Sequence, residues 1–308
     1  MKKFVIFAVP YKELSGGSIV LHKLCHLINR AGREAYITPY FSTFELNRKH
    51  AIRTLWRFAR ELEWSLRYPL RTNPNFNTPL IASPEEVADR DDYVAIYPEI
   101  VFGNPLGAAN VVRWLLHNPG FHTGRVFYGR NELYFGYNSA IKPFCFPGST
   151  TSPNDLKVIH YPLEYYNTDN TAAERSGTAY TVRKGKGKTI QHDLRESVLI
   201  DGKPHQEVAA IFKRVKTFIS YDPYTAYSTF AALCGCDSVV IPDEGVDEES
   251  WYPNPEDRYG LAYGFEGIEK AKKTRHLLYQ RVLREESNSV ESVAVFIKEV
   301  DAFFSRRT

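Results

Sequence analysis

The chain has 308 residues, a length that suggests two domains or one large one. Its 39 Lys and Arg residues against 36 Asp and Glu residues leave a formal net charge of +3. This balance excludes a histone-like or acidic-tail protein and gives no global attraction to nucleic acid. Hydrophobic residues make up 43% and charged residues 24%, so the chain is too apolar for disorder.

The N-terminal residues predict the start of a parallel α/β domain. Residues 4–9 form a continuous apolar run, as expected of a strand that is covered on both faces. A glycine turn at 15–18 follows, and apolar residues at helical spacing then extend to Gly32. Residues 34–38 predict a second strand. This order of strand, glycine turn, helix and strand is a βαβ unit.

The middle of the chain predicts further elements of this domain. Residues 46–67 predict a long amphipathic helix with six basic residues on its polar face, and residues 93–97 predict a strand. Asn104 and Pro105 predict the start of a helix that runs to Asn118.

Two polar segments, at 147–156 and 167–177, are the candidates for a linker, and strand-like pieces occur at 126–128 and 157–161. After residue 177 the alternation of strands and helices begins again.

The second half of the chain predicts a second α/β domain. The predicted elements are strands at 179–182, 197–200, 217–220 and 238–241 and helices at 206–216 and 226–233. An amphipathic segment at 290–304 predicts a C-terminal helix, which we expect to pack back on the N-terminal domain. We therefore predict an α/β protein with two Rossmann-like domains, residues 1–155 and 156–308, that face a cleft.

The segment 219–242 gives the strongest functional signal, because it reads as strand, polar turn, helix, small-residue turn and strand. Its turn lies at the carboxyl end of the predicted sheet, where a helix N-terminus offers free N–H groups and a partial positive charge. The polar side chains there are Asp222, Tyr224, Thr225, Ser228 and Thr229. A diphosphate suits such a site; the alternative is a helix cap and a tight turn without a ligand.

This segment resembles the donor-binding segment of nucleotide-sugar glycosyltransferases of the GT-B fold. In that family a loop with an acidic residue opens a helix that ends in an Ala-Leu-x-Cys-Gly-Cys-like turn before a Val-Val strand. The commoner form has two glutamates eight residues apart, whereas this chain has Asp222 at the first position and Phe230, beside Thr229, at the second. The tyrosine- and threonine-rich variant resembles bacterial rhamnosyl- and galactofuranosyltransferase-like enzymes that build surface polysaccharides.

Two other stretches support the resemblance. In the family an arginine and a nearby lysine after the first strand of the donor domain neutralise the diphosphate. The corresponding residues here are Arg183, with Lys184, Lys186 or Lys188, and the alternative is a solvated basic loop. A glycine pair after the first strand lets substrates approach the backbone in the family, and Gly16, Gly17 and Ser18 occupy that place.

Two residues are candidates for the catalytic base. An inverting transferase needs a carboxylate or imidazole to take the proton of the acceptor hydroxyl. Glu99, after the predicted strand 93–97, is the first candidate and His117 is the second; each could instead be a surface or capping residue. The Asp-Arg-Asp sequence at 89–91 has the form that metal-dependent transferases of another fold use, but it reads as a solvated loop. The resemblance implies neither a metal nor a cofactor.

The resemblance implies a glycosyltransferase that moves a sugar from a UDP-, dTDP- or GDP-linked donor to a glycan or lipid-linked glycan acceptor. The alternative is a non-catalytic protein of the same fold that binds a nucleotide or glycan. A turnover assay distinguishes the two.

The location follows from the N-terminus, the cysteines and the basic helix. The apolar run at 4–10 is too short for a signal peptide or a spanning helix, and the four cysteines read as buried thiols. We expect a cytoplasmic protein without a nucleic-acid partner. The helix at 46–67 either packs on the N-terminal sheet or docks peripherally on the anionic inner face of the membrane.

Overall fold

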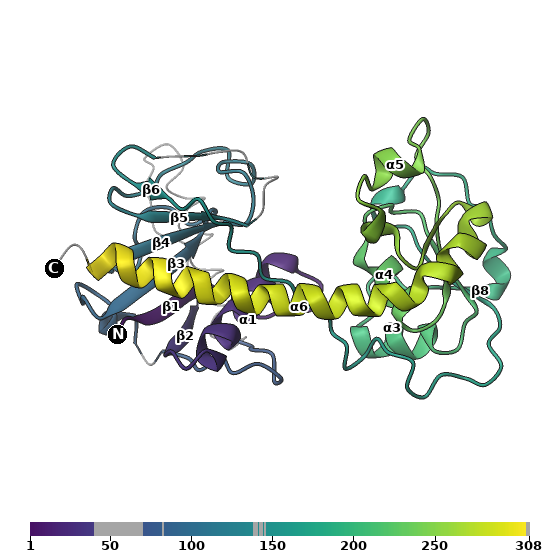
Figure 1. Ribbon diagram of the computed structural model, residues 1–308, viewed down its shortest axis with the longest axis horizontal. Helices are drawn as coiled ribbons and strands as arrows, with labels where there is room; N and C mark the ends of the chain where they lie inside the picture. Colours follow the sequence, from purple (N-terminus) through teal and green to yellow (C-terminus); the bar gives the residue numbers. More distant parts are fainter. Residues whose placement is uncertain (40–69, 82, 138–140, 142–143, 145, 306–308) are drawn as a thin grey trace, which may run out of the picture. The chain divides into compact units, whose positions relative to one another are not determined.

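The computed structural model describes residues 1–39, 70–81, 83–137, 141, 144 and 146–305. The chain divides into two compact units: the first contains Met1–His160 and Glu286–Thr308, and the second contains Tyr161–Glu285 (Figure 1). The first unit thus continues five residues past the expected boundary at 155 and also includes the end of the C-terminal helix. The expected helix at 46–67 lies outside the described residues.

The first unit contains a six-stranded, fully parallel sheet in the order β2-β1-β3-β4-β5-β6. Its strands are β1 (Lys3–Ala8), β2 (Ala35–Pro39), β3 (Tyr93–Pro98), β4 (Asn110–Leu115), β5 (Leu133–Gly136) and β6 (Thr150–Thr151). Helix α1 (Gly16–Arg30) connects β1 to β2, and the 3-10 helix η2 (Pro84–Glu86) precedes β3.

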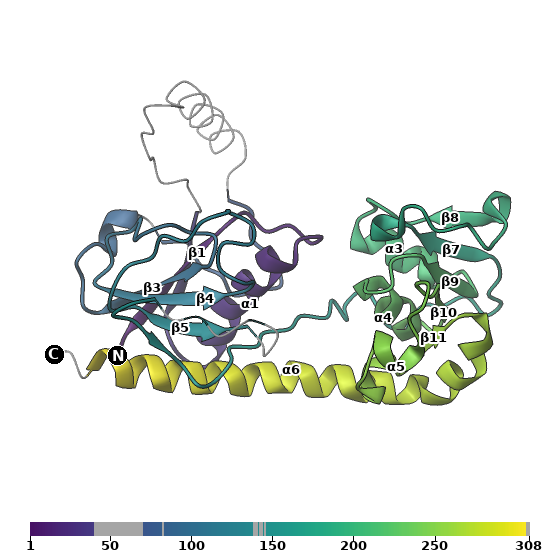
Figure 2. The ribbon, with the colours of Figure 1, turned by 90° about the horizontal axis from the view of Figure 1, so that it is seen from above.

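Alternate side chains of this sheet face two separate cores. Phe4 and Ile6 of β1 belong to the core that also contains residues of α1 and of the C-terminal part of α6 (Ile268–Ser305). Figure 2 shows these two helices beside the sheet. The ring of Phe296 on α6 lies 5.8 Å from that of Phe4. Val5 and Phe7 point to the other face, which connecting loops cover. Burial on both faces explains why β1 is apolar at every position.

The helix predicted from Asn104 to Asn118 is wrong, because this region forms β4. All six residues of β4 are buried within the sheet, so its apolar run reflects a covered strand and not a helix face. Asn104 caps a turn instead: its Oδ1 accepts from the Ala108 N–H at 3.1 Å and its Nδ2 donates to the Ala108 carbonyl at 2.9 Å.

Other expectations for this region also need correction. The segments 126–128 and 157–161 form no strand. The candidate linker 147–156 contains β6, and the other candidate, 167–177, lies inside the second unit.

The second unit contains a five-stranded parallel sheet in the order β11-β10-β9-β7-β8. Its strands are β7 (Thr178–Thr181), β8 (Ser197–Leu199), β9 (Thr217–Ser220), β10 (Asp237–Val240) and β11 (Leu261–Tyr263). The α-helices besides the start of α6 are α3 (His205–Phe212), α4 (Ala226–Leu233) and α5 (Glu248–Trp251). The 3-10 helices are η3 (Arg183–Gly185), η4 (Leu194–Glu196), η5 (Pro255–Arg258) and η6 (Phe265–Gly267).

The strand order of the second unit contains one reversal of direction. The chain places β8 on one side of β7, and β9, β10 and β11 follow on the other side. The reversal therefore lies between β7 and β9. In open parallel sheets, ligands bind outside the carboxyl ends of the strands at such a switch point.

The prediction of an α/β protein is confirmed, with two parallel sheets and a C-terminal helix that are compatible with a Rossmann-like fold. Within the described ranges, no helix combines the length and the apolar character that crossing a membrane requires.

Candidate functional site

The switch point of the second unit brings Arg183 and Asp222 together. Arg183 follows β7 and Asp222 follows β9, and the Nε atom of Arg183 lies 3.9 Å from Oδ2 of Asp222. The Arg183 side chain is 42% exposed, whereas that of Asp222 is only 5% exposed. The other carboxylate oxygen of Asp222 accepts from the Tyr224 N–H at 3.3 Å. Asp222 is thus a buried anchor that leaves the guanidinium of Arg183 open to solvent.

The helix α4 begins at the same edge of the sheet. Its N-cap is Thr225, whose hydroxyl accepts from the Tyr227 N–H at 3.4 Å. The first turn of α4 contains no acidic residue. No side chain of this turn therefore neutralises the partial positive charge that the free N–H groups give the helix N-terminus. The guanidinium of Arg183 lies 5.6 Å from the centre of the Tyr227 ring. A cationic side chain and a helix N-terminus therefore meet at one place.

Ser228, in the first turn of α4, has a buried side-chain hydroxyl without a hydrogen-bond partner among the described residues. Buried hydroxyls without a partner are uncommon because desolvation costs free energy. This hydroxyl therefore lies inside the second unit and offers no donor at the surface of the site.

The lysines of the loop after β7 differ in their contacts. Lys188 donates to the Ile241 carbonyl at 2.7 Å and forms an ion pair with Asp243 at 2.6 Å, so its charge is already neutralised. Its contacts fix the loop to the end of β10. Lys186 is exposed. Arg183 is therefore the better-placed cation for an anionic ligand.

The remaining donor-site candidates lie in different surroundings. Tyr224 is 58% exposed, and its ring meets that of Tyr252 edge-on at 5.7 Å. Thr229 is half-buried on α4. Phe230, at the position where the resembling family commonly has a second carboxylate, lies in the core and stacks on Tyr166 at 4.3 Å.

In the first unit, the expected glycine turn forms the start of α1. A Cβ built on Gly16 would meet no atom within 4 Å, and one built on Gly17 would lie 3.9 Å from the Leu116 side chain. Ser18 is buried: its hydroxyl accepts from the Lys12 N–H at 2.8 Å and donates to the Pro10 carbonyl at 3.2 Å. Ser18 thus closes the turn after β1, and the two glycines leave free space.

Glu99 and His117 lie at the carboxyl edge of the same sheet, after β3 and β4. The carboxylate of Glu99 is buried and accepts from the Leu116 N–H at 3.1 Å. Burial raises the pKa of Glu99, and this effect exceeds the opposing effect of its backbone hydrogen bonds and the nearby His122 and His117. His117 is half-buried, and its ring stacks on Phe121 at 4.0 Å. Both candidate bases therefore lie at the carboxyl edge of this sheet, where Leu116, the residue before His117, lies near Gly17 of α1.

Sequence reasoning missed a histidine–tyrosine pair beside the switch point. The hydroxyl of Tyr221 accepts from the Gln191 N–H at 2.7 Å and lies 2.8 Å from Nδ1 of His192. Burial lowers the pKa of His192 and raises that of Tyr221. No spacing in the sequence indicates this pair, because residues 29 positions apart meet only through the fold.

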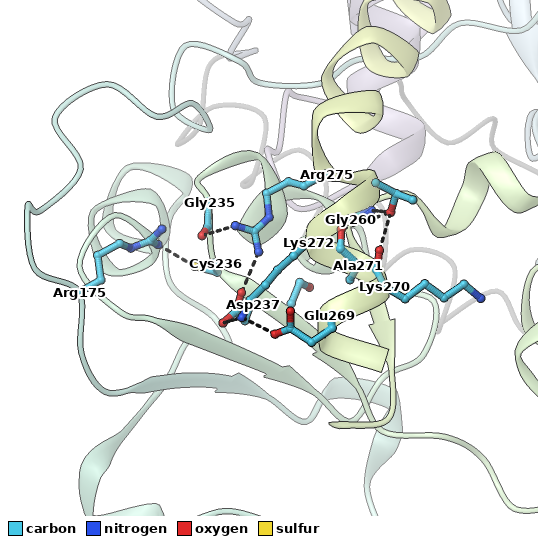
Figure 3. A network of polar contacts seen from close by, with 12 residues as sticks. Arg175, Gly235, Cys236, Asp237, Gly260, Glu269, Lys270, Ala271, Lys272 and Arg275 are labelled. Carbon is cyan, nitrogen blue, oxygen red and sulfur yellow. Dashed lines mark hydrogen bonds and ion pairs between the residues drawn. The ribbon is translucent and has the colours of Figure 1, made fainter. Parts of the chain in front are cut away.

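The opposite edge of the second sheet contains a polar network without the features of a ligand site (Figure 3). Arg275 on α6 donates to the Gly235 carbonyl at 3.0 Å and to Asp237 at 2.8 Å (Figure 3). These contacts attach α6 to the start of β10. Arg175 donates to the sulfur of Cys236 at 3.1 Å.

The described cysteines are buried free thiols, as predicted. Burial raises the pKa of Cys234 to about 12 and that of Cys236 to about 11. Cys145 lies outside the described residues. In the part of the chain that the structure describes, no cluster of three or more His, Cys, Asp or Glu residues could hold a metal.

Comparison with known proteins finds no matching family model and no matching curated protein.

Proposed function

We propose that the chain is a nucleotide-sugar glycosyltransferase whose second unit binds the diphosphate of the donor at the switch point between β7 and β9. One observation carries the proposal: the solvent-exposed guanidinium of Arg183 and the N-terminus of α4 meet at this point. Both features favour an anion, and a Rossmann-like sheet binds its ligand at this edge.

The reaction fits the chemistry of these groups. The bond between the anomeric carbon and the diphosphate oxygen breaks, and a new bond forms to the acceptor oxygen. The diphosphate leaves with additional negative charge, which the guanidinium of Arg183 and the N–H groups of α4 stabilise. The acceptor hydroxyl loses its proton to a base. Glu99 is the first candidate because burial raises its pKa and thus its basicity, and His117 is the second.

The substrate classes and the location are part of the same proposal. The donor is a UDP-, dTDP- or GDP-linked sugar, and the acceptor is a glycan or lipid-linked glycan of polysaccharide biosynthesis. No metal or cofactor takes part in the proposed reaction. A cytoplasmic protein with peripheral membrane contact through the basic residues of 46–67 would reach a lipid-linked acceptor.

A non-catalytic nucleotide- or glycan-binding protein is the second candidate. Two observations favour it: Phe230 fills the core where a donor-binding carboxylate is common in the resembling family, and Asp243 neutralises Lys188. Such a protein would bind the nucleotide but would transfer no sugar.

Two measurements on the full chain test the proposal. First, UDP, dTDP, GDP and their sugar derivatives are added in a thermal-shift panel. A ligand at 100 times its Kd stabilises the unit that it binds by about 2.7 kcal/mol. Second, the stabilising sugar nucleotide is incubated with oligosaccharide and lipid-linked acceptors and assayed for transfer. Stabilisation with transfer supports the glycosyltransferase, and stabilisation without transfer supports the non-catalytic binding protein. If no diphosphate stabilises the chain, neither a glycosyltransferase nor a nucleotide-binding protein is supported.

A further inference from the structure

The backbone of Arg183 has a conformation that arginine rarely adopts. Its φ is +39°, in the left-handed region that disfavours residues with a Cβ. Such a conformation persists only where the surrounding contacts hold it, and it is common at functional sites. The contacts that hold Arg183 therefore determine where its guanidinium points.

The carboxylate of Asp201 supplies these contacts. Asp201 lies two residues beyond the end of β8, the neighbour of β7 in the sheet. One of its oxygens accepts from the Thr181 hydroxyl, and the other accepts from the N–H groups of Val182 and Arg183 at 3.2 Å and 3.0 Å. Three consecutive residues at the exit of β7 thus donate to one carboxylate.

We infer that Asp201 is the positioning residue of the anion site: it fixes the strained backbone at Arg183 so that the guanidinium lies at the switch point. The inference rests on the proposed function, because it assigns Asp201 to the site that binds the diphosphate. The two N–H groups after β7 are already occupied by Asp201. These two N–H groups therefore do not bind the ligand, which the guanidinium of Arg183 and the N-terminus of α4 hold instead.

The direction in which anion affinity changes when Asp201 is removed distinguishes a positioning role from a purely electrostatic one. Asp201 is negatively charged, and by Coulomb's law alone its removal would strengthen the binding of an anion nearby. If it acts by holding Arg183, its removal weakens binding. Asp201→Ala removes all three acceptor contacts, whereas Asp201→Asn removes the charge but keeps an amide oxygen that can accept from Val182 and Arg183.

The experiment uses the full chain with inorganic pyrophosphate and UDP as ligands in calorimetric titrations. We expect Asp201→Ala to weaken binding about tenfold, a loss of about 1.4 kcal/mol, and Asp201→Asn to recover most of the affinity. Asp193→Asn is the matched control, since Asp193 also accepts from a backbone N–H, that of Arg195 at 2.9 Å. In an Arg183→Ala background, Asp201→Ala should change the affinity no further.

Hydrogen exchange without ligand gives a readout that does not depend on the proposed function. The amides of Val182 and Arg183 should exchange at least about tenfold faster in Asp201→Ala than in the wild type and Asp193→Asn. Unchanged exchange, or tighter anion binding in both Asp201 variants, overturns the inference. A wild type that binds neither ligand contradicts the proposed function, and the exchange rates then still decide whether Asp201 holds this loop.

Discussion

Gly185 lies so close to the carbonyl group of Tyr221 that no side chain fits between them. A Cβ built on Gly185 would overlap the Tyr221 carbonyl oxygen and lie 2.8 Å from the Tyr221 Cβ. Tyr221 is fully buried and its N–H donates to the Thr181 carbonyl at 3.0 Å, so it cannot move aside easily. The loop after β7 thus crosses the end of β9 in direct backbone contact.

Gly185→Ala should therefore disturb both the loop and the site. We expect the free energy of unfolding of the second unit to fall by about 1–3 kcal/mol, the usual cost of forcing extra atoms into a packed region. Nucleotide binding should weaken as well. Urea unfolding measures the first effect. Gly16→Ala is the control, because its added Cβ would meet no atom within 4 Å; equal stability of both variants contradicts the close contact.

The left-handed backbone of Arg183 predicts a difference between two small substitutions. Glycine adopts φ of +39° without strain, whereas alanine does not. Arg183→Gly should therefore be more stable than Arg183→Ala by about 1 kcal/mol, although both lose the guanidinium. Thermal unfolding of the two variants measures this difference. If the alanine variant is equally or more stable, the backbone at this position is not left-handed.

The buried ion pair of the first unit predicts a large effect on stability. Arg113 and Glu132 are almost fully buried, and their closest atoms are 2.7 Å apart. Glu132→Gln leaves the charge of Arg113 without its counter-charge and should cost about 3–5 kcal/mol. The exposed pair Arg90–Asp92 is the control, and Asp92→Asn should cost less than about 1 kcal/mol. Similar losses in the two variants, measured by urea unfolding, would show that Glu132 is not buried in this way.

The raised pKa of Glu99 predicts a pH effect of definite sign. Between the unfolded pKa, near the ordinary value of 4.5, and the higher folded pKa, the native state binds more protons than the unfolded state. Glu99 therefore makes the first unit less stable as the pH rises through this window. Glu99→Gln should remove this contribution, so its advantage over the wild type should grow with pH. Unfolding at a series of pH values tests this, and a difference that is constant or shrinks contradicts the raised pKa.

The sequence predicted those elements whose signals are local. The strand at 4–9 could be predicted because its continuous apolar run lies within six residues. The helix α4 could be predicted because its N-cap, Thr225, lies directly before it. β4 was misread because Val111, Val112 and Leu115 fit a helix as well as a strand that is covered on both faces, and only the sheet decides between them. A single buried strand gives no periodicity that separates the two.

The candidate site likewise contains residues whose position the sequence predicts and residues whose role depends on the fold. The sequence could predict that Arg183 and Asp222 lie at this edge of the sheet, because each lies within two residues of the end of a predicted strand. Thr225 could be predicted there because it directly precedes a predicted helix. The roles of Asp201 and Asp243 could not, because they depend on which strands are neighbours. Lys188, for example, donates to the carbonyl of a residue 53 positions away, so its charge appeared free in the sequence.

The central claim is that the switch point between β7 and β9 binds a nucleoside diphosphate through Arg183. The most direct measurement is calorimetric titration of the full chain with UDP, dTDP and GDP in the wild type, Arg183→Ala and Arg195→Ala. Arg195 is the control because its side chain is 88% exposed and paired with Asp193. We predict that the wild type and Arg195→Ala bind at least one of the three with equal affinity, and that Arg183→Ala binds it at least about tenfold more weakly. Equal affinity in Arg183→Ala, or no binding of any of the three by the wild type, would contradict the account.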